Sequence, residues 1–385
     1  MILTESTMKY ILTFILSFLS FLVCSQNITI TDTPTIDQLP VNAIHRVFRD
    51  SEGYMWYGTV NGLCRDDGYH VKVFRSDIET PGLLEDNLVE CIAEDKKGNI
   101  WFGTDKGVYI LDKSDYSVHP MDRERLKNIP VMYLYATSDG YMWLSYRSIL
   151  AKYDINGQLV KEYPLRNKYG RTTISGFCES RNHEIIISVW NGRVYHLDKE
   201  KDEFVPYPDK MRRQNPTVMV QDNEQDYFWL ATWGDGVVRF DPSAPEDSMF
   251  VYSEIPVNAA GEEDGVILSL VQDDKLGYIW LTTGHDFMSL QIQPDKTLKQ
   301  LKFQTGLLPV NHMLVEVLKG RGCLWVSAFD RPSFIVHLMD NMTKDYALPA
   351  LADRVNRSPA VMALCDDGDG MMWMMQERTG WCYMT

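Results

Sequence analysis

Short apolar runs separated by turn residues follow one another along most of the chain. The runs are Ile44–Phe48, Leu88–Ala93, Val131–Ala136, Ile174–Cys178, Val218–Val220, Val266–Val271, Met313–Leu318 and Val361–Leu364. None is longer than six residues, many hold β-branched side chains, and most are followed within two residues by Asp or Gly. Runs of this length and composition are typical of buried β-strands rather than helices.

A thirteen-residue phrase links these runs into repeats. Residues 95–107 read DKKGNIWFGTDKG, and residues 50–62 read DSEGYMWYGTVNG, an almost complete second copy. Weaker copies are centred on Trp143, Trp229, Trp280, Trp325 and Trp373, and a degenerate copy has Ile186 in the Trp position. Successive centres lie 42 to 51 residues apart. A strand-like repeat of this period predicts a β-propeller.

Each repeat predicts a blade of four antiparallel strands. The Asp-x-x-Gly step reverses the chain after the first strand, and the second strand carries the Trp. A second reversal at Thr-x-x-Gly leads into third strands such as Val108–Leu111 and Val237–Phe240. Fourth strands are predicted at His70–Phe74, Glu203–Tyr207, Met249–Tyr252 and Leu298–Phe303. Because one sheet cannot bury both faces alone, we expect each Trp to lie in the layer between neighbouring blades.

The sequence predicts an all-β ring of seven blades, with eight as the alternative. The copy around Trp373 stops at Thr385, where its third strand is forming. Seven repeats in residues 26–350 form the ring in our preferred arrangement, and residues 351–385 begin a second propeller. In the alternative, Asn27–Thr31 supplies the missing fourth strand of the eighth repeat and closes an eight-bladed ring.

Residues 1–25 read as a signal peptide. Lys9 precedes the mostly apolar stretch Ile11–Val23, which is short for a membrane span, and Val23-Cys24-Ser25 offers a cleavage site after Ser25. A lipoprotein site at Cys24 is the weaker alternative. Export predicts a periplasmic or cell-surface location.

Composition narrows the partners. The net charge is −15, which argues against nucleic acid or an anionic membrane surface. Beyond Cys24, six cysteines lie scattered through the repeats without a Cys-x-x-Cys pair, so we expect buried free thiols and no structural zinc. The carboxylates of residues 366–370 (DDGDG) resemble a Ca²⁺ loop but lack its distal Glu, and an ordinary turn is preferred. No metal or cofactor is predicted.

The repeat resembles a known family. The pattern Asp-x-x-Gly-x-Ile-Trp-Phe-Gly-Thr-x-x-Gly-Val, followed by Tyr109-Ile110-Leu111-Asp112, is similar to the two-component regulator propeller repeat. The segment Ile44–Phe74, with Asp67-Gly68-Tyr69 before its outer strand, resembles the first repeat of periplasmic sensors from Bacteroides-type bacteria. The likeness covers nearly all of the mature chain and is clearest around Trp56 and Trp101.

The resemblance implies the sensor region of a hybrid two-component system. Members of that group carry two seven-bladed propellers, a β-sandwich, a membrane helix, a histidine kinase, a receiver and a DNA-binding module. It also implies an oligosaccharide ligand and a homodimer formed through the full sensor. No kinase or helix-turn-helix pattern occurs in these 385 residues. We therefore expect a sensor fragment that is not itself an enzyme, binds no nucleic acid and reaches the membrane only through C-terminal parts.

Blade geometry predicts where a ligand binds. The turn after the second strand and the link between blades share one face, opposite the Asp-x-x-Gly turns, and loops on a rigid scaffold usually carry binding. Several of these turns combine aromatic rings with polar side chains that suit a sugar. The candidates are Arg147, Trp190, Asn191, Trp233, Asp235, His285, Asp286, Asp330 and Arg331. Trp190 and Trp233 rank first because exposed Trp is uncommon.

Two other classes of function fit the same fold. An exported propeller enzyme acting on glycans, such as a sialidase-like hydrolase or a lyase, is the first alternative, although the chain has no Ser-x-Asp-x-Gly-x-Thr-Trp box. A non-catalytic interaction scaffold is the second. Propellers host all three roles, so the fold alone does not decide among them.

Overall fold

The computed structural model describes residues 29–338, with gaps at 168–169, 209, 212–214, 259–260, 274–276, 284–285, 301–313, 320–322 and 329–332. It also describes three strands at 361–366, 372–376 and 380–384. The chain divides into two compact units, Met1–Asp340 and Asn341–Thr385.

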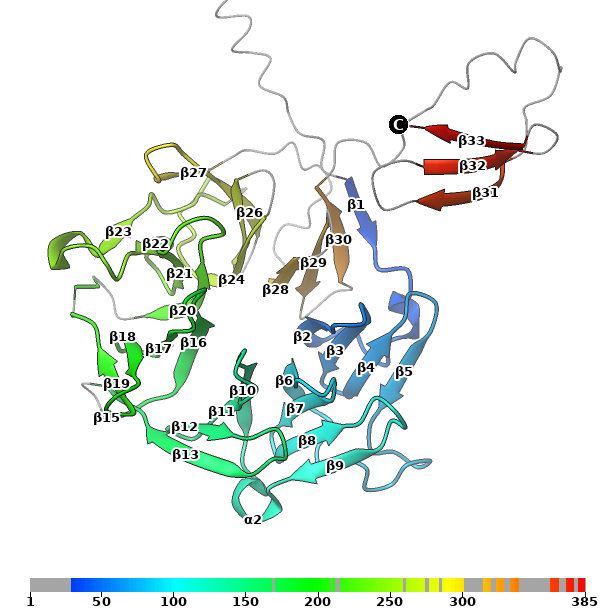
Figure 1. Cartoon of the computed structure of the whole chain (residues 1–385), viewed down its shortest axis with the longest axis horizontal. Coiled ribbons are helices and arrows are strands. Elements are labelled where there is room, and N and C mark those ends of the chain that lie inside the picture. The colour runs from blue at the N-terminus through cyan, green and yellow to red at the C-terminus, as the bar shows by residue number, and fades with distance from the viewer. Residues whose placement is uncertain are drawn as a thin grey trace, which may run out of the picture. The chain divides into compact units, whose positions relative to one another are not determined.

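Seven four-stranded antiparallel sheets make up the first unit, arranged around a central axis (Figure 1). Blades 1 to 3 hold β2 (Ile44–Arg49), β3 (Met55–Thr59), β4 (Gly62–Asp66), β5 (Val71–Phe74); β6 (Val89–Glu94), β7 (Ile100–Thr104), β8 (Gly107–Leu111), β9 (Val118–Met121); and β10 (Val131–Ala136), β11 (Met142–Tyr146), β12 (Ile149–Tyr153), β13 (Leu159–Pro164). Blades 4 to 6 hold β16 (Ile174–Glu179), β17 (Ile185–Val189), β18 (Val194–Asp198), β19 (Glu203–Pro206); β20 (Pro216–Gln221), β21 (Phe228–Thr232), β22 (Val237–Phe240), β23 (Phe250–Tyr252); and β24 (Ile267–Gln272), β25 (Tyr278–Thr283), β26 (Phe287–Ile292), β27 (Leu298–Gln300). The predicted seven-bladed, four-stranded propeller is confirmed.

The seventh blade is built from both ends of the unit. It holds β28 (Leu314–Lys319), β29 (Cys323–Ala328), β30 (Phe334–His337) and, as its outer strand, β1 (Thr29–Asp32). Strand β1 pairs with β30 from Thr29 opposite His337 to Asp32 opposite Phe334. The alternative in which this N-terminal segment closes an eighth blade is therefore wrong, because its hydrogen bonds are used in blade 7.

Short irregular elements occupy the connections between these strands. They are η1 (Ile36–Gln38), α2 (Arg123–Leu126), the hairpin of β14 (Arg166–Asn167) and β15 (Gly170–Arg171), and η2 (Glu246–Ser248). In the second unit, β31 (Val361–Asp366), β32 (Met372–Gln376) and β33 (Gly380–Met384) form a three-stranded antiparallel sheet. Among the described residues, none forms a helix long and apolar enough to cross a membrane.

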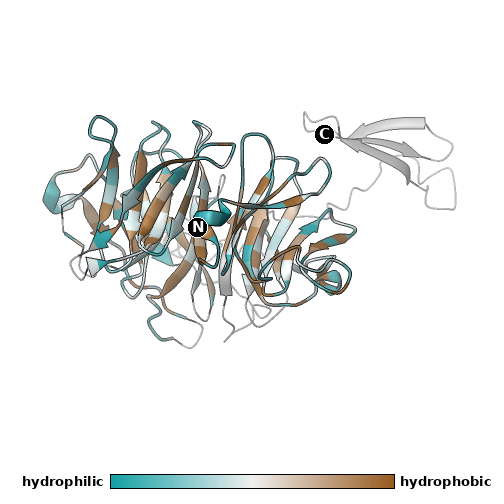
Figure 2. Ribbon diagram, turned by 90° about the horizontal axis from the view of Figure 1, so that it is seen from below, coloured by the Kyte–Doolittle hydropathy of each residue, from teal (hydrophilic) through white to brown (hydrophobic). Residues whose placement is uncertain are grey.

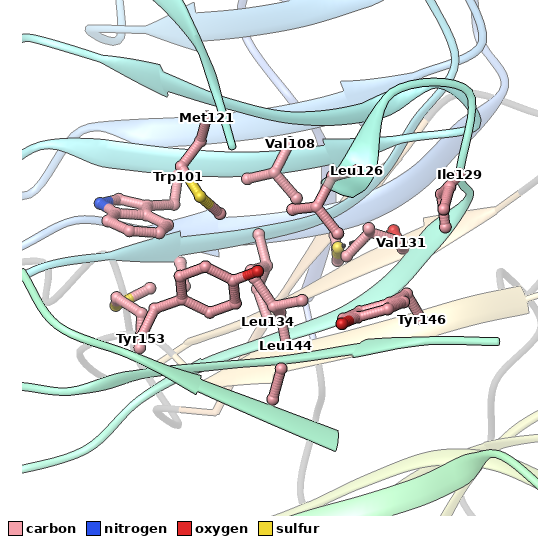
Figure 3. Close-up of a cluster of buried hydrophobic side chains, with 14 residues drawn as sticks. Trp101, Val108, Met121, Leu126, Ile129, Val131, Leu134, Leu144, Tyr146 and Tyr153 are labelled. Atoms are coloured by element: carbon pink, nitrogen blue, oxygen red, sulfur yellow. Dashed lines mark hydrogen bonds between the residues drawn. The ribbon is translucent and has the colours of Figure 1, made fainter. Parts of the chain in front are cut away.

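The hydrophobic core lies between the blades rather than at the axis. Each of the seven pairs of neighbouring blades has its own cluster of buried apolar side chains. In the cluster between blades 2 and 3, Trp101 lies on β7 and packs with Leu134 and Tyr153 of blade 3 (Figure 3). Apolar positions run along the strands while the turns are hydrophilic (Figure 2). The radial stack thus hides both faces of every sheet.

The recurring tryptophans occupy these layers, as predicted. Trp56, Trp101, Trp143, Trp229 and Trp280 are each at most 1% exposed. Blade 4 has Ile186 in this position, also buried, and Trp325 of blade 7 is half-buried against blade 1. Trp373 lies on β32, whose side chains are outside the described residues. The tryptophans are therefore packing residues wherever their side chains are described, apart from the two on irregular turns discussed below.

The aspartate of the repeat has a role that the sequence pattern did not reveal. Asp95 Oδ1 accepts the backbone N–H groups of Lys97 (2.8 Å) and Asn99 (2.9 Å), which holds the turn. Its Oδ2 accepts the indole N–H of Trp101 at 2.9 Å. Three other blades make the same indole bond, from Trp56 to Asp50, from Trp229 to Asp222 and from Trp280 to Asp273. One carboxylate therefore satisfies both the turn and the buried indole.

The Gly-Thr pair that follows the Trp also has a physical cause. A Cβ on Gly103 would lie 2.5 Å from the carbonyl oxygen of Val131, so only glycine allows β7 to approach blade 3 this closely. Thr104 Oγ1 donates to the carbonyl of Gly107 at 3.1 Å and accepts the N–H of Lys106 at 3.1 Å. The hydroxyl therefore closes the turn from within.

The cysteines lie in the blades as isolated thiols. Cys64, Cys91 and Cys178 are buried and free, as predicted, and Cys323 is partly exposed. Burial raises the pKa of the Cys64 and Cys91 thiols to about 12. These thiols are neutral at physiological pH and therefore unreactive. The side chains of Cys365 and Cys382 are outside the described residues.

Candidate functional site

The two faces of the propeller carry different sets of turns. One face, here called the link face, carries the turns between second and third strands together with the links between blades. The N–H of Gly62, in such a turn, donates to the carbonyl of Asn87 in the following link at 2.7 Å. The opposite face, here called the Asp-turn face, carries the Asp-x-x-Gly turns and the turns between third and fourth strands. The predicted division of the turns between two faces is therefore confirmed.

Two tryptophans from neighbouring blades meet on the link face. Trp190 follows β17 of blade 4, and Trp233 follows β21 of blade 5. Their ring centroids lie 5.6 Å apart at an interplanar angle of 79°, an edge-to-face contact. Trp233 is 46% exposed, and Trp190 is half-buried. The structure therefore brings together the two residues that ranked first from the sequence, although 43 positions separate them.

The blade 5 turn holds Trp233 by backbone contacts. The N–H of Trp233 donates to the carbonyl of Asn215 at 2.8 Å, and the N–H of Gly234 donates to the carbonyl of Gly265 at 2.8 Å. Gly234 has φ +117°, and a Cβ on Gly265 would lie 2.6 Å from the Gly234 oxygen. Larger residues would push the turn away from the link. The exposed indole therefore stands on a fixed backbone rather than on a loose loop.

The blade 4 turn holds Trp190 in a similar way. The N–H of Trp190 donates to the carbonyl of Thr173 at 2.9 Å, and Thr172 Oγ1 donates to the carbonyl of Trp190 at 2.6 Å. Asn191, the next residue, adopts φ +51°, which Asn tolerates better than most side chains. Both rings are thus positioned by the link that precedes their own blade, which favours a preformed surface.

The other predicted residues fall at different places around the link face. Arg147, exposed at φ +53°, belongs to blade 3, beside the blade of Trp190. Asp235 is half-buried beside Trp233, and its N–H donates to Thr232 Oγ1 at 3.0 Å. Asp286 of blade 6 is buried, at 8% exposure, and its backbone bonds with Thr283 close the turn. His285, Asp330 and Arg331 lie outside the described residues.

Two groups on this face were missed by the sequence analysis. Asp264, 6% exposed, lies in the link from blade 5 to blade 6, next to Gly265. His45 and Glu90 begin the inner strands of blades 1 and 2, and their Nδ1 and Oε2 atoms are 3.2 Å apart. These residues belong to links and inner strands, whereas the residues predicted from the sequence all lie in turns after second strands. All three lie in the sequence at or just before the start of an inner strand, and this position is the signal that could have identified them.

The sector around blades 1 and 2 is acidic. Burial, together with the neighbouring carboxylates of Glu90 and Asp86, raises the pKa of Asp105 above its usual value. The link face therefore has an acidic sector at blades 1 and 2 and an aromatic sector at blades 4 and 5. Within the described ranges, no three His, Cys, Asp or Glu side chains are grouped so as to hold a metal ion.

Fold and face together define a seven-bladed β-propeller with a candidate binding surface on its link face. Residues 38–61 and 83–106 match the two component regulator propeller family, which confirms the resemblance in the repeats of blades 1 and 2. No curated protein matches the sequence significantly.

Solved structures share the fold at low identity. Two are extracellular domains of putative hybrid two component systems from B. thetaiotaomicron. One is 18% identical with TM-score 0.63, covering 89% of this chain and 45% of that one; the other is 15% identical with TM-score 0.62, covering 93% and 48%. Virginiamycin B lyase from Staphylococcus aureus is 11% identical with TM-score 0.62, covering 81% and 99%. At these identities the likeness establishes the propeller fold. This chain spans slightly less than half the length of the two B. thetaiotaomicron domains.

Proposed function

We propose that this chain is the ligand-sensing extracytoplasmic propeller of a hybrid two-component regulatory system, and that it recognises an oligosaccharide on its link face. The family match of two repeats and the likeness to extracellular domains of such systems support the class of protein. The single observation that supports the ligand is the Trp190–Trp233 pair.

The chemistry of that pair suits a sugar. A pyranose ring offers an apolar C–H face that packs on an indole and hydroxyls that exchange hydrogen bonds with polar side chains. Asp235 and Asn191 flank the two rings in sequence, and the exposed cation Arg147 lies on the adjacent blade. With a net charge of −15, the chain disfavours strongly anionic partners at long range. Neutral oligosaccharides are therefore the first class to test.

Signalling in this proposal belongs to a longer protein. Ligand binding shifts a two-state equilibrium only when the ligand has different affinities for the two states. The propeller supplies recognition rather than catalysis, and the states differ in how it is arranged against further domains or a second subunit of a homodimer. Residues 1–25 act as the signal peptide that directs the protein to the periplasm, and residues 351–385 open a second propeller.

The test is calorimetric titration of the purified chain with a panel of defined neutral oligosaccharides. Trp233→Ala should weaken binding about 30-fold, in the range of a central aromatic contact. Its melting temperature should stay close to that of the parent chain, since Trp233 is already 46% exposed. Tyr69→Ala is the matched control, because Tyr69 is 80% exposed and lies on the Asp-turn face.

Four results would overturn the assignment. One is unchanged affinity in the Trp233 variant, and another is an equal loss in the Tyr69 variant. Product formation during the titration would identify a glycan-cleaving enzyme instead, and no saturable binding across the panel would leave an interaction scaffold.

A further inference from the structure

A hollow of about 420 Å³ opens on the Asp-turn face between blades 5 and 6, away from the surface proposed for oligosaccharides. Its walls include Asp222, Glu224, Tyr227, Gln272, Ile292 and Lys296. The volume lies within the range of small-molecule sites. The lining is mostly polar, with carboxylates, amides and one ammonium group.

The corresponding place between blades 1 and 2 is filled by a lysine. Lys113 Nζ lies 2.7 Å from Glu94, 2.8 Å from Glu52 and 3.4 Å from Asp50. The Lys113 side chain is only 12% exposed. Although burial opposes the charged form, these carboxylates outweigh it, and the pKa of Lys113 is raised. The repeat can therefore build a specific pocket for an ammonium group.

Strand register shows that Ile292 occupies the lysine position in blade 6. Trp101 pairs with Ile110, three residues before Lys113, and Trp280 pairs with Ser289, three residues before Ile292. The N–H of Ile292 donates to the carbonyl of Gly277, the counterpart of Gly98 three residues before the Trp. The ammonium group is thus replaced by an aliphatic side chain at this interface.

The surrounding acceptors are largely kept. Asp222 and Glu224 in the blade 5 turn correspond to Asp50 and Glu52 in the blade 1 turn. Gln272, directly before Asp273, corresponds to Glu94, directly before Asp95. The frame is also the same: the N–H of Asn223 donates to Gln272 Oε1 at 2.9 Å, as the N–H of Ser51 donates to Glu94 Oε2 at 2.7 Å.

The turns that border the hollow depart from the repeat. From the turn Asp to the Trp there are seven positions in blades 5 and 6 but six in blades 1 and 2. Gln272 Nε2 donates to Asp222 Oδ2 at 3.1 Å, and Lys296 Nζ donates to Gln225 Oε1 at 2.9 Å. Lys296 Nζ also lies 5.1 Å from the Tyr227 ring centroid, so two contacts within the lining hold its charge. Ile292, at the position of Lys113, is part of the lining of the hollow.

We propose that this hollow binds a small primary amine whose ammonium group takes the position of Lys113 Nζ, next to Asp222 and Glu224. The aliphatic part of the ligand packs against Ile292, whose side chain takes the place of the lysine stem in the other interface. Amino sugars and short diamines have this chemistry. The site is independent of the oligosaccharide surface, because it lies on the other face of the ring.

The test uses n-butylamine as an analogue of the lysine side chain, with binding measured by NMR titration and thermal shift. We expect saturable binding with Kd on the order of 1–10 mM, as suits a ligand of five heavy atoms. Ile292→Lys should place an ammonium group in the hollow, raise the melting temperature and weaken butylamine binding at least tenfold. Ile292→Met, of similar length without charge, is the matched control and should retain binding.

Two further variants make the result decisive. Lys113→Ala should create a second butylamine site between blades 1 and 2, with partial recovery of the melting temperature on addition of the amine. Glu224→Gln should weaken binding in the natural hollow severalfold without changing the melting temperature. Unchanged butylamine affinity in the Ile292→Lys variant would overturn the proposal. So would a melting temperature that rises with acetate but not with butylamine, because the hollow would then bind anions through Lys296.

Discussion

The Asp-turn face and the link face are built from the same repeats, yet they differ in how much the blades have in common. On the Asp-turn face, four blades use the same aspartate to hold the turn and the next tryptophan's indole. On the link face, the corresponding turns differ, from Thr104–Gly107 to Trp233–Gly236. Uniform turns accompany stability, and variable turns leave room for recognition.

Contacts between blades follow the same division. On the Asp-turn face, the N–H of the residue after the turn Asp or its replacement donates to the last side chain of the next inner strand. The pairs are Ser51–Glu94, Ser138–Glu179, Arg181–Gln221 and Asn223–Gln272. On the link face, contacts such as Trp190 with Trp233 join only particular blades. Substitutions on the two faces should therefore have different consequences.

Trp101→Ala should have the largest effect on stability. The side chain is fully buried between blades 2 and 3, so truncation leaves a cavity and should lower the free energy of unfolding by about 3–5 kcal/mol. Urea denaturation followed by circular dichroism measures this loss. Trp233→Ala on the link face, expected to cost about 1 kcal/mol through the loss of its edge-to-face contact with Trp190, is the control. Equal losses in the two variants would remove the contrast between interblade and surface tryptophans.

Asp95→Ala should rank second. It leaves the buried indole N–H of Trp101 and two turn amides without their acceptor. A buried donor left unsatisfied costs about 1–3 kcal/mol, and we expect a loss of about 2–3 kcal/mol by urea denaturation. Asp95→Asn, which keeps one carbonyl oxygen, should lose less. A loss no larger than that of a surface substitution would contradict the dual role of the carboxylate.

Glu94→Ala should cost about 2 kcal/mol, because Glu94 accepts from Ser51 and pairs with Lys113 at an 11% exposed position. Glu94→Gln should cost roughly 1 kcal/mol less, since Gln272 shows that an amide can accept the same backbone bond between blades 5 and 6. Thermal melts of both variants give the order. If the Gln variant were as unstable as the Ala variant, the ion pair with Lys113 rather than the hydrogen bond from Ser51 would account for most of the stability that Glu94 contributes.

Asp105→Asn on the link face should have the smallest effect and the opposite sign. The raised pKa means that the folded protein binds this proton more tightly than the unfolded chain, so ionisation of Asp105 destabilises the fold as pH rises through that pKa. The Asn variant should be more stable by at most about 0.5 kcal/mol at neutral pH. The gain in stability should vanish below the ordinary Asp pKa, where Asp105 is neutral in both the folded and the unfolded state. Melting curves from pH 3 to pH 8 check this, and a gain that grows on acidification would contradict it.

The local pattern determined the blade. Strand positions, the two reversals and the buried Trp follow from the phrase at residues 95–107, because turn chemistry and burial act within some twenty residues. The choice between seven and eight blades depended on the pairing of β1 with β30. The same pattern placed the irregular turns on one face, since consecutive antiparallel strands alternate in direction.

Only the tertiary structure decided which distant residues meet. The ring brings β1 onto β30 across 306 positions, Trp190 onto Trp233, and Lys113 onto Asp50 across 63 positions. It also showed that Ile292 stands where another blade has a lysine. Repeats with similar local sequences do not specify how each blade fills its border with the next, because that choice depends on side chains from two blades packed together in the closed ring.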